Sequence, residues 1–157
     1  MDIDTVLVPV DQSEESVVAV EYAAAVADRY DAGIHVLSVL DEDVSRALER
    51  GTMDEADVAA DHEAFIERVL QLENVDWKVD ADGGDPETVP LTHSTVHGFS
   101  PSRLMRHPGS AVLDVAEEVD ADFVVVPRES VEGGTTKVLE KADVYVLSYA
   151  DQPVLSV

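Results

Sequence analysis

Short apolar runs alternate along the chain with longer segments in which apolar residues recur every three or four positions. The runs at 5–10, 34–40 and 123–127 are rich in valine, and polar turn-forming residues lie beside them. Such runs are typical of strands that are buried on both faces of a parallel sheet. They predict three strands, and residues 153–157 (PVLSV) predict a last short one.

The segments between these strands show helical periodicity. Ser13 is placed to cap the first helix, acidic residues follow in its first turn, and Gly33 is expected to end it. Further helices are expected up to about Gln71, from Ser110 onward, and after Thr135-Thr136. The residues expected along one face of the first of these helices are Val58, Phe65, Val69 and Leu72, and the expected buried stripe of the second is Val112, Val115, Ala116 and Val119. The third helix carries Val138, Leu139, Ala142, Val146 and Tyr149, of which Tyr149 is expected to be half-buried.

The middle of the chain leaves two candidates for another parallel strand. The segment around Trp77 and the segment Thr92–Gly98 both alternate polar and apolar residues. Thr92–Gly98 is preferred because a helix follows soon after it, while the Trp77 segment could pair beside it. Residues 41–54 are acidic and give no clear assignment, and residues 99–109 carry two prolines and three basic residues, which predicts a loop of atypical composition.

Strands that are separated by helices require right-handed crossovers, so the pattern predicts one doubly wound α/β domain over residues 1–157. Its parallel sheet should have helices on both faces. In such folds a ligand binds beyond the carboxyl ends of the strands, where the strand order reverses.

The charge narrows the choice of partners. The 157 residues include 34 Asp and Glu but only 10 Lys and Arg, which gives a formal net charge of −24. A surface of this charge repels nucleic acid and anionic lipid, so neither is expected as a partner. Dense carboxylates are tolerated where molar salt shortens the screening length to about 3 Å, which favours a salt-adapted source.

Cysteine is absent, so disulfides and thiolate metal sites are excluded and a reducing compartment fits. The first residues lack the basic start and long apolar stretch of a signal peptide, and no apolar run approaches the length of a membrane span. We therefore expect a cytoplasmic protein without membrane insertion.

Motifs for catalysis are missing from the sequence. It contains no G-x-S-x-G elbow, no P-loop and no G-x-G-x-x-G after the first strand. His93 and His97 would share one face of a strand, with His107 in the following loop, but histidines on half-exposed strands and in loops are ordinary and no zinc spacing is reproduced. We expect no metal and no enzymatic activity.

Three segments resemble the universal stress protein family, and together they extend over nearly the whole chain. TVLVPVDQSEES at 5–16 resembles the family's first strand, its terminal Asp and the start of the first helix. AVLDVAEEVDADFVVVP at 111–127 resembles the third helix and fourth strand, and ADQPVLSV at 150–157 resembles the C-terminal strand. The resemblance implies a five-stranded sheet of order 3-2-1-4-5 and a homodimer formed through the last strand, here Val154, Leu155 and Val157.

For one branch of the family the resemblance also implies ATP, bound between strands one and four by three glycines and a Ser or Thr after the fourth strand. A gapless alignment places Pro127, Ser130, Glu140 and Lys141 at those four positions. Proline has no N–H to offer a phosphate, and the other substitutions bring side chains and, at Glu140, a negative charge. We therefore disfavour ATP as a cofactor.

Three interpretations stay open at this stage. The first is a binding or regulatory module in stress response that no longer uses ATP as its switch. The second is a module for another nucleotide or anion, held by Asp11, Arg128 and Lys141, with Lys137 as a further cation nearby. The third, a nucleotide-utilising enzyme, has no legible catalytic residues. In the family the acidic position matched by Asp11 faces adenine and ribose, although Asp11 is equally explained as a turn residue.

Overall fold

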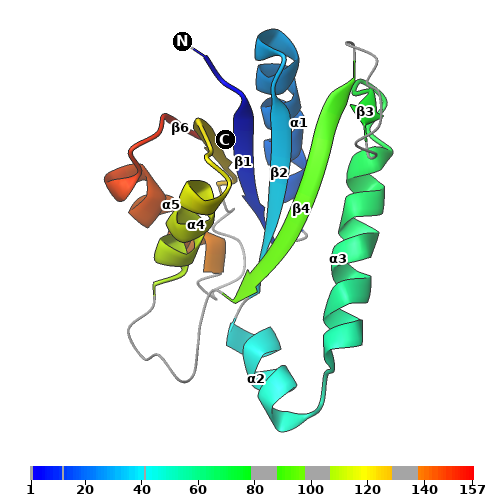
Figure 1. Cartoon of the computed structure of the whole chain (residues 1–157). Coiled ribbons are helices and arrows are strands. Elements are labelled where there is room, and N and C mark those ends of the chain that lie inside the picture. Colours follow the sequence, from blue (N-terminus) through cyan, green and yellow to red (C-terminus); the bar gives the residue numbers. More distant parts are fainter. Residues whose placement is uncertain (1, 12, 41, 79–87, 98–106, 129–137) are drawn as a thin grey trace.

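The computed structural model describes residues 2–11, 13–40, 42–78, 88–97, 107–128 and 138–157, and it places them in one parallel α/β layer structure (Figure 1). Six parallel strands form a sheet of order β3-β4-β2-β1-β5-β6. In chain order the elements are β1 (Thr5–Val10), α1 (Glu14–Tyr30), β2 (Gly33–Leu40), α2 (Glu42–Arg50), α3 (Glu55–Leu70), β3 (Trp77–Lys78), β4 (Val89–His97), α4 (Pro108–Glu118), β5 (Phe123–Val126), α5 (Val138–Tyr149) and β6 (Val154–Ser156).

The five strands β4, β2, β1, β5 and β6 follow the predicted order 3-2-1-4-5, so the predicted fold is confirmed. The two middle-region candidates both form strands. The Thr92–Gly98 prediction corresponds to β4, which begins earlier, at Val89, and pairs with β2. The Trp77 segment forms the two-residue β3 on the outer side of β4.

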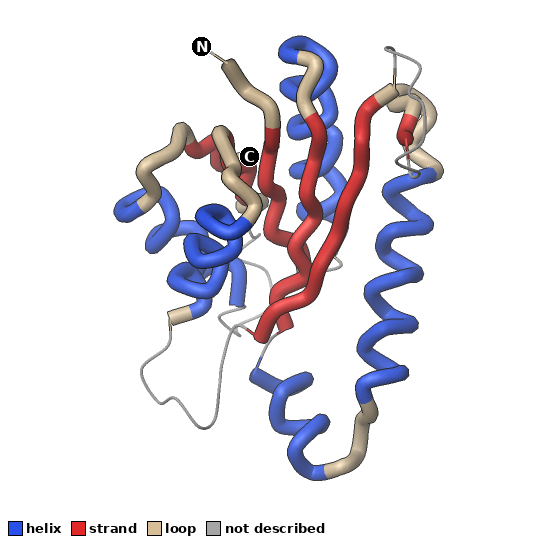
Figure 2. Tube along the Cα trace, in the orientation of Figure 1, coloured by secondary structure: helices blue, strands red, loops and turns tan. Residues whose placement is uncertain are grey.

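Helices cover both faces of the sheet, which explains why most side chains of the central strands β1 and β2 are apolar and buried. Alternate side chains enter two cores: Val6 and Val8 pack in the core that includes residues of α1 and α3, whereas Leu7 packs in the core that includes residues of α4 and α5. Figure 2 shows α1 running behind β1 and β2, with α4 and α5 on the opposite side. Every described residue of β1 after Thr5 is buried.

The ends of α1 confirm one prediction and correct another. Ser13 is the N-cap, as predicted, and its hydroxyl accepts the Ser16 N–H. The helix does not end at Gly33. Asp31 takes the left-handed conformation at the C-cap, with φ 56°, because a short polar side chain tolerates this region, and its N–H donates to Ala27. Gly33 is already the first residue of β2.

The start of α4 also differs from the prediction. The helix begins at Pro108, before the expected cap Ser110, because Pro108 suits the first helical turn and the His107 ring accepts the Gly109 N–H at 3.0 Å. His107 to Gly109 are therefore not part of the predicted loop, and residues 99–106 lie outside the described residues. Gly109 is required here, because a Cβ would lie 2.5 Å from the Cβ of Tyr145 in α5.

The acidic segment 41–54 that gave no assignment contains α2, and the helix predicted up to about Gln71 is α3, which ends at Leu70 with Gln71 as its C-cap. None of the described helices is long and apolar enough to span a membrane.

Candidate functional site

β1 and β5 lie side by side, and the sheet extends in opposite directions from them. From β1 the order leads through β2 to β4, whereas β5 is followed by β6 on the other side. Crossovers on opposite sides open a crevice at the carboxyl ends of two such strands. The residues that directly follow β1 and β5 are therefore the candidate ligand site.

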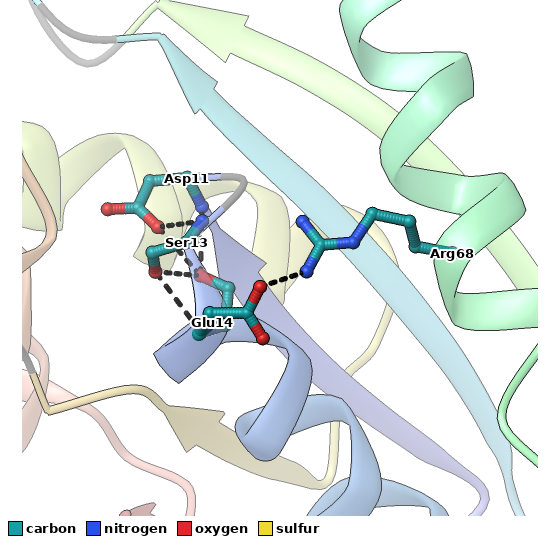
Figure 3. Close-up of polar contacts among 5 residues, drawn as sticks. Asp11, Ser13, Glu14 and Arg68 are labelled. Carbon is teal, nitrogen blue, oxygen red and sulfur yellow. Dashed lines mark hydrogen bonds and ion pairs between the residues drawn. The ribbon is translucent and has the colours of Figure 1, made fainter.

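The exit from β1 is organised by Asp11, Ser13 and Ser16 (Figure 3). Asp11 Oδ1 accepts the Ser13 N–H at 3.0 Å and the Ser16 hydroxyl at 2.8 Å. Ser16 Oγ in turn accepts the Asp11 N–H at 3.1 Å, and Ser13 Oγ accepts the Ser16 N–H at 3.2 Å. Ser16 is fully buried, so these hydrogen bonds satisfy polar groups that water does not reach.

An ion pair links this exit to α3. Arg68 Nη2 lies 2.6 Å from Glu14 Oε1, in the first turn of α1, as Figure 3 shows. The two side chains are 43% and 84% exposed, so the pair contributes little to stability. Its importance is positional, because it connects α3 with the start of α1.

The exit from β5 is built differently. Pro127 is buried and has no N–H, and the Arg128 N–H donates to the carbonyl of Val157 in the C-terminal segment. The Arg128 side chain points the same way, since its Nε donates to Ser156 Oγ at 3.4 Å. The first two main-chain positions after β5 thus direct no N–H toward a ligand.

Arg128 also belongs to a chain of contacts with α5. The Ser156 hydroxyl donates to Asp143 Oδ2 at 3.3 Å, while Asp143 Oδ1 is buried and has no partner among the described residues. Burial raises the pKa of Asp143, and the Ser156 hydrogen bond and the charge of Arg128 act in the opposite direction. The hydrogen bond from Ser156 and the charge of Arg128 therefore offset only part of the cost of burying the Asp143 carboxylate.

The structure describes only some of the residues that were predicted to form the ligand site. Asp11 and Arg128 lie at the same edge of the sheet, but the described partners of Asp11 are at the start of α1 and those of Arg128 are at the C-terminus. Ser130 lies outside the described residues. Glu140 and Lys141 belong to α5, and their side chains are outside the described part of the structure, so these three residues and Lys137 stay predictions.

Val154, Leu155 and Val157 are half-buried on and beside β6, the last strand of the described sheet. Leu155 and Val157 pack against the core on the α1 side, and Val154 packs against the core on the α4 side. Their part in a dimer interface is a prediction.

The structure also reveals buried histidines that the sequence interpretation missed. His62 Nδ1 is hydrogen-bonded to Ser38 Oγ, and His62 Nε2 lies 2.8 Å from His93 Nδ1. On the other face of the sheet, His35 bridges Thr92 and Ser94, with 2.7 Å between each pair of atoms. A signal for His62 was present, because it falls within the helical stripe that contains Val58, Phe65 and Val69.

Burial lowers the pKa of His62 and of His35, and the neighbouring His93 lowers both further. These rings therefore favour the neutral state. Of the candidate metal ligands, His97 has a side chain that is not described, and His107 caps α4. Among the described side chains, no group of three or more His, Asp or Glu is arranged to hold a metal ion.

Two surface crevices lie away from this edge. One, of about 650 Å³, lies between α1 and the segment that follows α3, and the other, of about 430 Å³, lies where α4 and α5 end. Both are at the amino end of the strands, and neither is lined by Asp11, Pro127 or Arg128.

The comparisons with known proteins agree with this fold. A solved universal stress protein in complex with cAMP is 19% identical with a TM-score of 0.63, and the match covers 100% of this chain and 98% of that chain. The universal stress protein UspA from Lactobacillus plantarum is 18% identical (TM-score 0.60; 100% and 99% covered). The universal stress protein from Archaeoglobus fulgidus in complex with dAMP is 16% identical (TM-score 0.59; 99% and 98% covered).

Identities this low establish the fold alone. The search of curated proteins found no match. The sequence profile described as the Universal stress protein family, however, matches residues 2–157. The chain therefore belongs to the universal stress protein family.

Proposed function

We propose that this protein is a non-enzymatic binding or regulatory module in stress response, and that it does not use ATP as its switch. The observation that carries this proposal is the exit from β5. Pro127 lacks an N–H, and the N–H of Arg128 is engaged by Val157. A polyphosphate is normally cradled by several main-chain amides next to a helix N-terminus.

The β1 exit supports the same proposal from the other side. Its hydrogen bonds among Asp11, Ser13 and Ser16 keep α1 capped without a ligand. The start of α1 is thus held by its own hydrogen bonds. The first two residues after β5, Pro127 and Arg128, are not suited to contact phosphates through their main chain. We infer that the protein acts through contacts with a partner protein.

Calorimetric titration with Mg-ATP in molar KCl tests this proposal. We expect no saturable heat at micromolar concentrations of ATP. A micromolar dissociation constant would refute the proposal. Native mass spectrometry of the protein purified in high salt from its own cells provides an independent check, because a co-purified ATP would be seen as added mass.

The second candidate function is binding of a smaller nucleotide or another anion by Asp11, Arg128 and Lys141. It is favoured by the exposed Arg128, whose side-chain contact with Ser156 is long at 3.4 Å. Proteins of similar fold have been solved with cAMP and with dAMP, each of which has a single phosphate. One phosphate needs fewer donors than three, and a guanidinium is a strong donor to it.

Titrations with cAMP, dAMP and inorganic phosphate distinguish the two candidates. If one of these anions binds, the variants Arg128→Ala and Lys141→Ala should weaken its binding at least about tenfold, since each removes a charged contact. Asp2→Ala, an exposed position before β1, is the control. Unchanged affinity in both cationic variants would eliminate the second candidate.

We also propose a homodimer formed through β6. The N–H of Val157 and the carbonyl oxygens of Pro153 and Val157 bond to β5, so the amides of Val154 and Ser156 face the outer side of the strand. An outer edge of this kind is a template for pairing with another strand. Beside it, α5 exposes Val144, Leu147 and Tyr149, with 66%, 50% and 67% of their surface accessible.

The variant Val154→Pro tests the dimer because it removes an outward N–H and leaves the hydrogen bonds to β5 available. We expect light scattering in high salt to report a dimer for the wild type and a monomer for Val154→Pro. Val154→Ala keeps the N–H and is expected to stay dimeric. A monomeric wild type would contradict the interface.

Finally, we propose that the protein is adapted to a salt-rich cytoplasm. Most of the described Asp and Glu residues are exposed, with Asp143 among the partly buried exceptions, so most of the negative charge of the described residues is carried at the surface. Screening by molar salt reduces the repulsion among surface carboxylates. The melting temperature should therefore rise from low salt to molar KCl, and a constant melting temperature would contradict the adaptation.

A further inference from the structure

The side chains of Ser38, His62 and His93, which we name the histidine latch, join three elements of the fold. Ser38 lies on β2, His62 on α3 and His93 on β4. Ser38 and His62 are buried, with 4% and 7% of their surfaces exposed, whereas the ring of His93 reaches the surface. The latch is therefore a polar contact that connects the middle of α3 to the sheet.

The geometry of the latch depends on its protonation. His62 Nε2 and His93 Nδ1 face each other at 2.8 Å, which leaves room for one hydrogen between them. In the neutral pair, one ring donates and the other accepts, while Ser38 pairs with His62 Nδ1. If both rings are protonated, two N–H groups and two positive charges point at each other, and the contact cannot persist.

We propose that the histidine latch is an acid-sensitive device that holds α3 on the sheet at neutral pH and releases it when both rings become charged. The exposed His93 can turn into solvent, which leaves the buried, charged His62 without its partner at Nε2. His62 can reach water only if its helix moves, so release acts on α3.

Two contacts show where a movement of α3 is transmitted. Arg68, in the last turn of α3, pairs with Glu14 at the start of α1, next to the N-cap Ser13. The carbonyl of Val69 accepts the indole N–H of Trp77 at 3.0 Å. The first contact reaches the carboxyl edge of β1, and the second reaches β3.

The charges around the latch are consistent with a neutral resting state. Burial and then the charge of His93 lower the pKa of His62, and Glu63 on the same helix acts in the opposite direction. His35, on the other face of the sheet, has a pKa that burial and His93 lower and that Glu118 of α4 raises. Because the folded pKa of His62 lies below 6.5, its stabilising effect is present above pH 6.5 and is lost as the pH falls through the folded value.

Trp77 is a built-in reporter, since the chain has one tryptophan and its indole is bonded to α3. We would record its fluorescence between about pH 7.5 and 5, a window in which unperturbed histidines titrate and ordinary carboxylates do not. The wild type should show a reversible transition with a midpoint below 6.5. His62→Gln keeps a polar side chain without a titrating charge, and the transition should disappear.

The matched control is His35→Gln, which removes a buried histidine from the opposite face and should retain the Trp77 transition. The proposal is overturned if His62→Gln shows the wild-type transition, or if His35→Gln abolishes it. Should His62→Gln fail to fold, ¹⁵N spectra of the histidine rings in the wild type decide the question. The latch requires His62 to become protonated over the Trp77 transition, and a His62 ring that stays neutral throughout would contradict it.

Discussion

The exits of β1 and β5 lie at the same edge of the sheet and are built from different parts of the chain. At β1, side chains satisfy backbone N–H groups, because Asp11, Ser13 and the buried Ser16 form hydrogen bonds with one another around the start of α1. At β5, the first two residues after the strand direct no main-chain N–H toward the edge, because Pro127 has no N–H and the Arg128 N–H donates to the carbonyl of Val157. The difference teaches that side chains can build the start of a helix after one strand, while the first two residues after the neighbouring strand direct no main-chain N–H toward the edge.

The largest loss of stability is expected from Ser16→Ala, just after β1. The change removes a hydroxyl that bonds to both the N–H and the carboxylate of Asp11 in a fully buried place. Leaving buried polar groups without partners costs about 1–3 kcal/mol. Denaturant unfolding in molar KCl measures this loss.

The exposed Ser148 of α5 provides the control, and Ser148→Ala should change stability by less than about 0.5 kcal/mol. An equal effect of the two substitutions would mean that the β1 exit is not a buried hydrogen-bonded unit.

A smaller effect is expected from Ser13→Ala. This side chain caps α1 by accepting the Ser16 N–H, and its surface is half-buried. Loss of an N-cap costs typically about 1 kcal/mol. The same unfolding experiment should place Ser13→Ala between Ser148→Ala and Ser16→Ala, and Ser13→Asp should restore most of the loss. No recovery with Ser13→Asp would argue against a capping role.

At the β5 exit, Asp143→Asn is expected to change the pH dependence of stability. Burial raises the folded pKa of Asp143, so its relative contribution to stability is present at low pH and is lost as the pH rises through that value. A neutral Asn avoids this loss. Melting curves from about pH 4 to 7 should therefore show a variant that is at least as stable as the wild type at neutral pH, with the advantage shrinking in acid.

The exposed Asp151 serves as the comparison, and Asp151→Asn should follow the wild-type pH curve. If Asp143→Asn is less stable at neutral pH, the contact of Asp143 with Ser156 stabilises the β5 exit more than burial of the carboxylate destabilises it.

The smallest effects are expected from the two arginines. Arg128→Ala removes an exposed side chain with a long contact, and Arg68→Ala removes an exposed ion pair. Each should lower the free energy of unfolding by less than about 1 kcal/mol, because solvent screens exposed pairs. A loss of several kcal/mol for Arg128→Ala would show that its side chain, and not only its amide, holds the C-terminal strand.

Much of the fold could be predicted from the sequence because both sheet faces are covered. Mostly apolar runs such as 5–10 and 34–40 are stable as buried strands of a parallel sheet, and the capping Ser13 lies next to its helix in the sequence. The predicted end of α1 and the predicted start of α4 were wrong. Asp31 and His107 took the capping roles through local geometry that composition does not reveal.

The candidate site could be predicted only in part. The absence of an N–H at Pro127 is visible in the sequence, but the bond from Arg128 to Val157 joins residues that become neighbours only after the sheet forms. The contact of the buried His62 was missed for the same reason, since His62 and His93 are 31 positions apart and meet through packing of α3 on β4.

The amide of Arg128 provides the most direct test of the claim that the β5 exit does not hold a triphosphate. In ¹⁵N-labelled wild-type protein, titrated with Mg-ATP in molar KCl, its resonance should stay in place and remain protected from hydrogen exchange by the bond to Val157. A saturable shift of the Arg128 amide at micromolar ATP, with the bond to Val157 broken, would contradict the account.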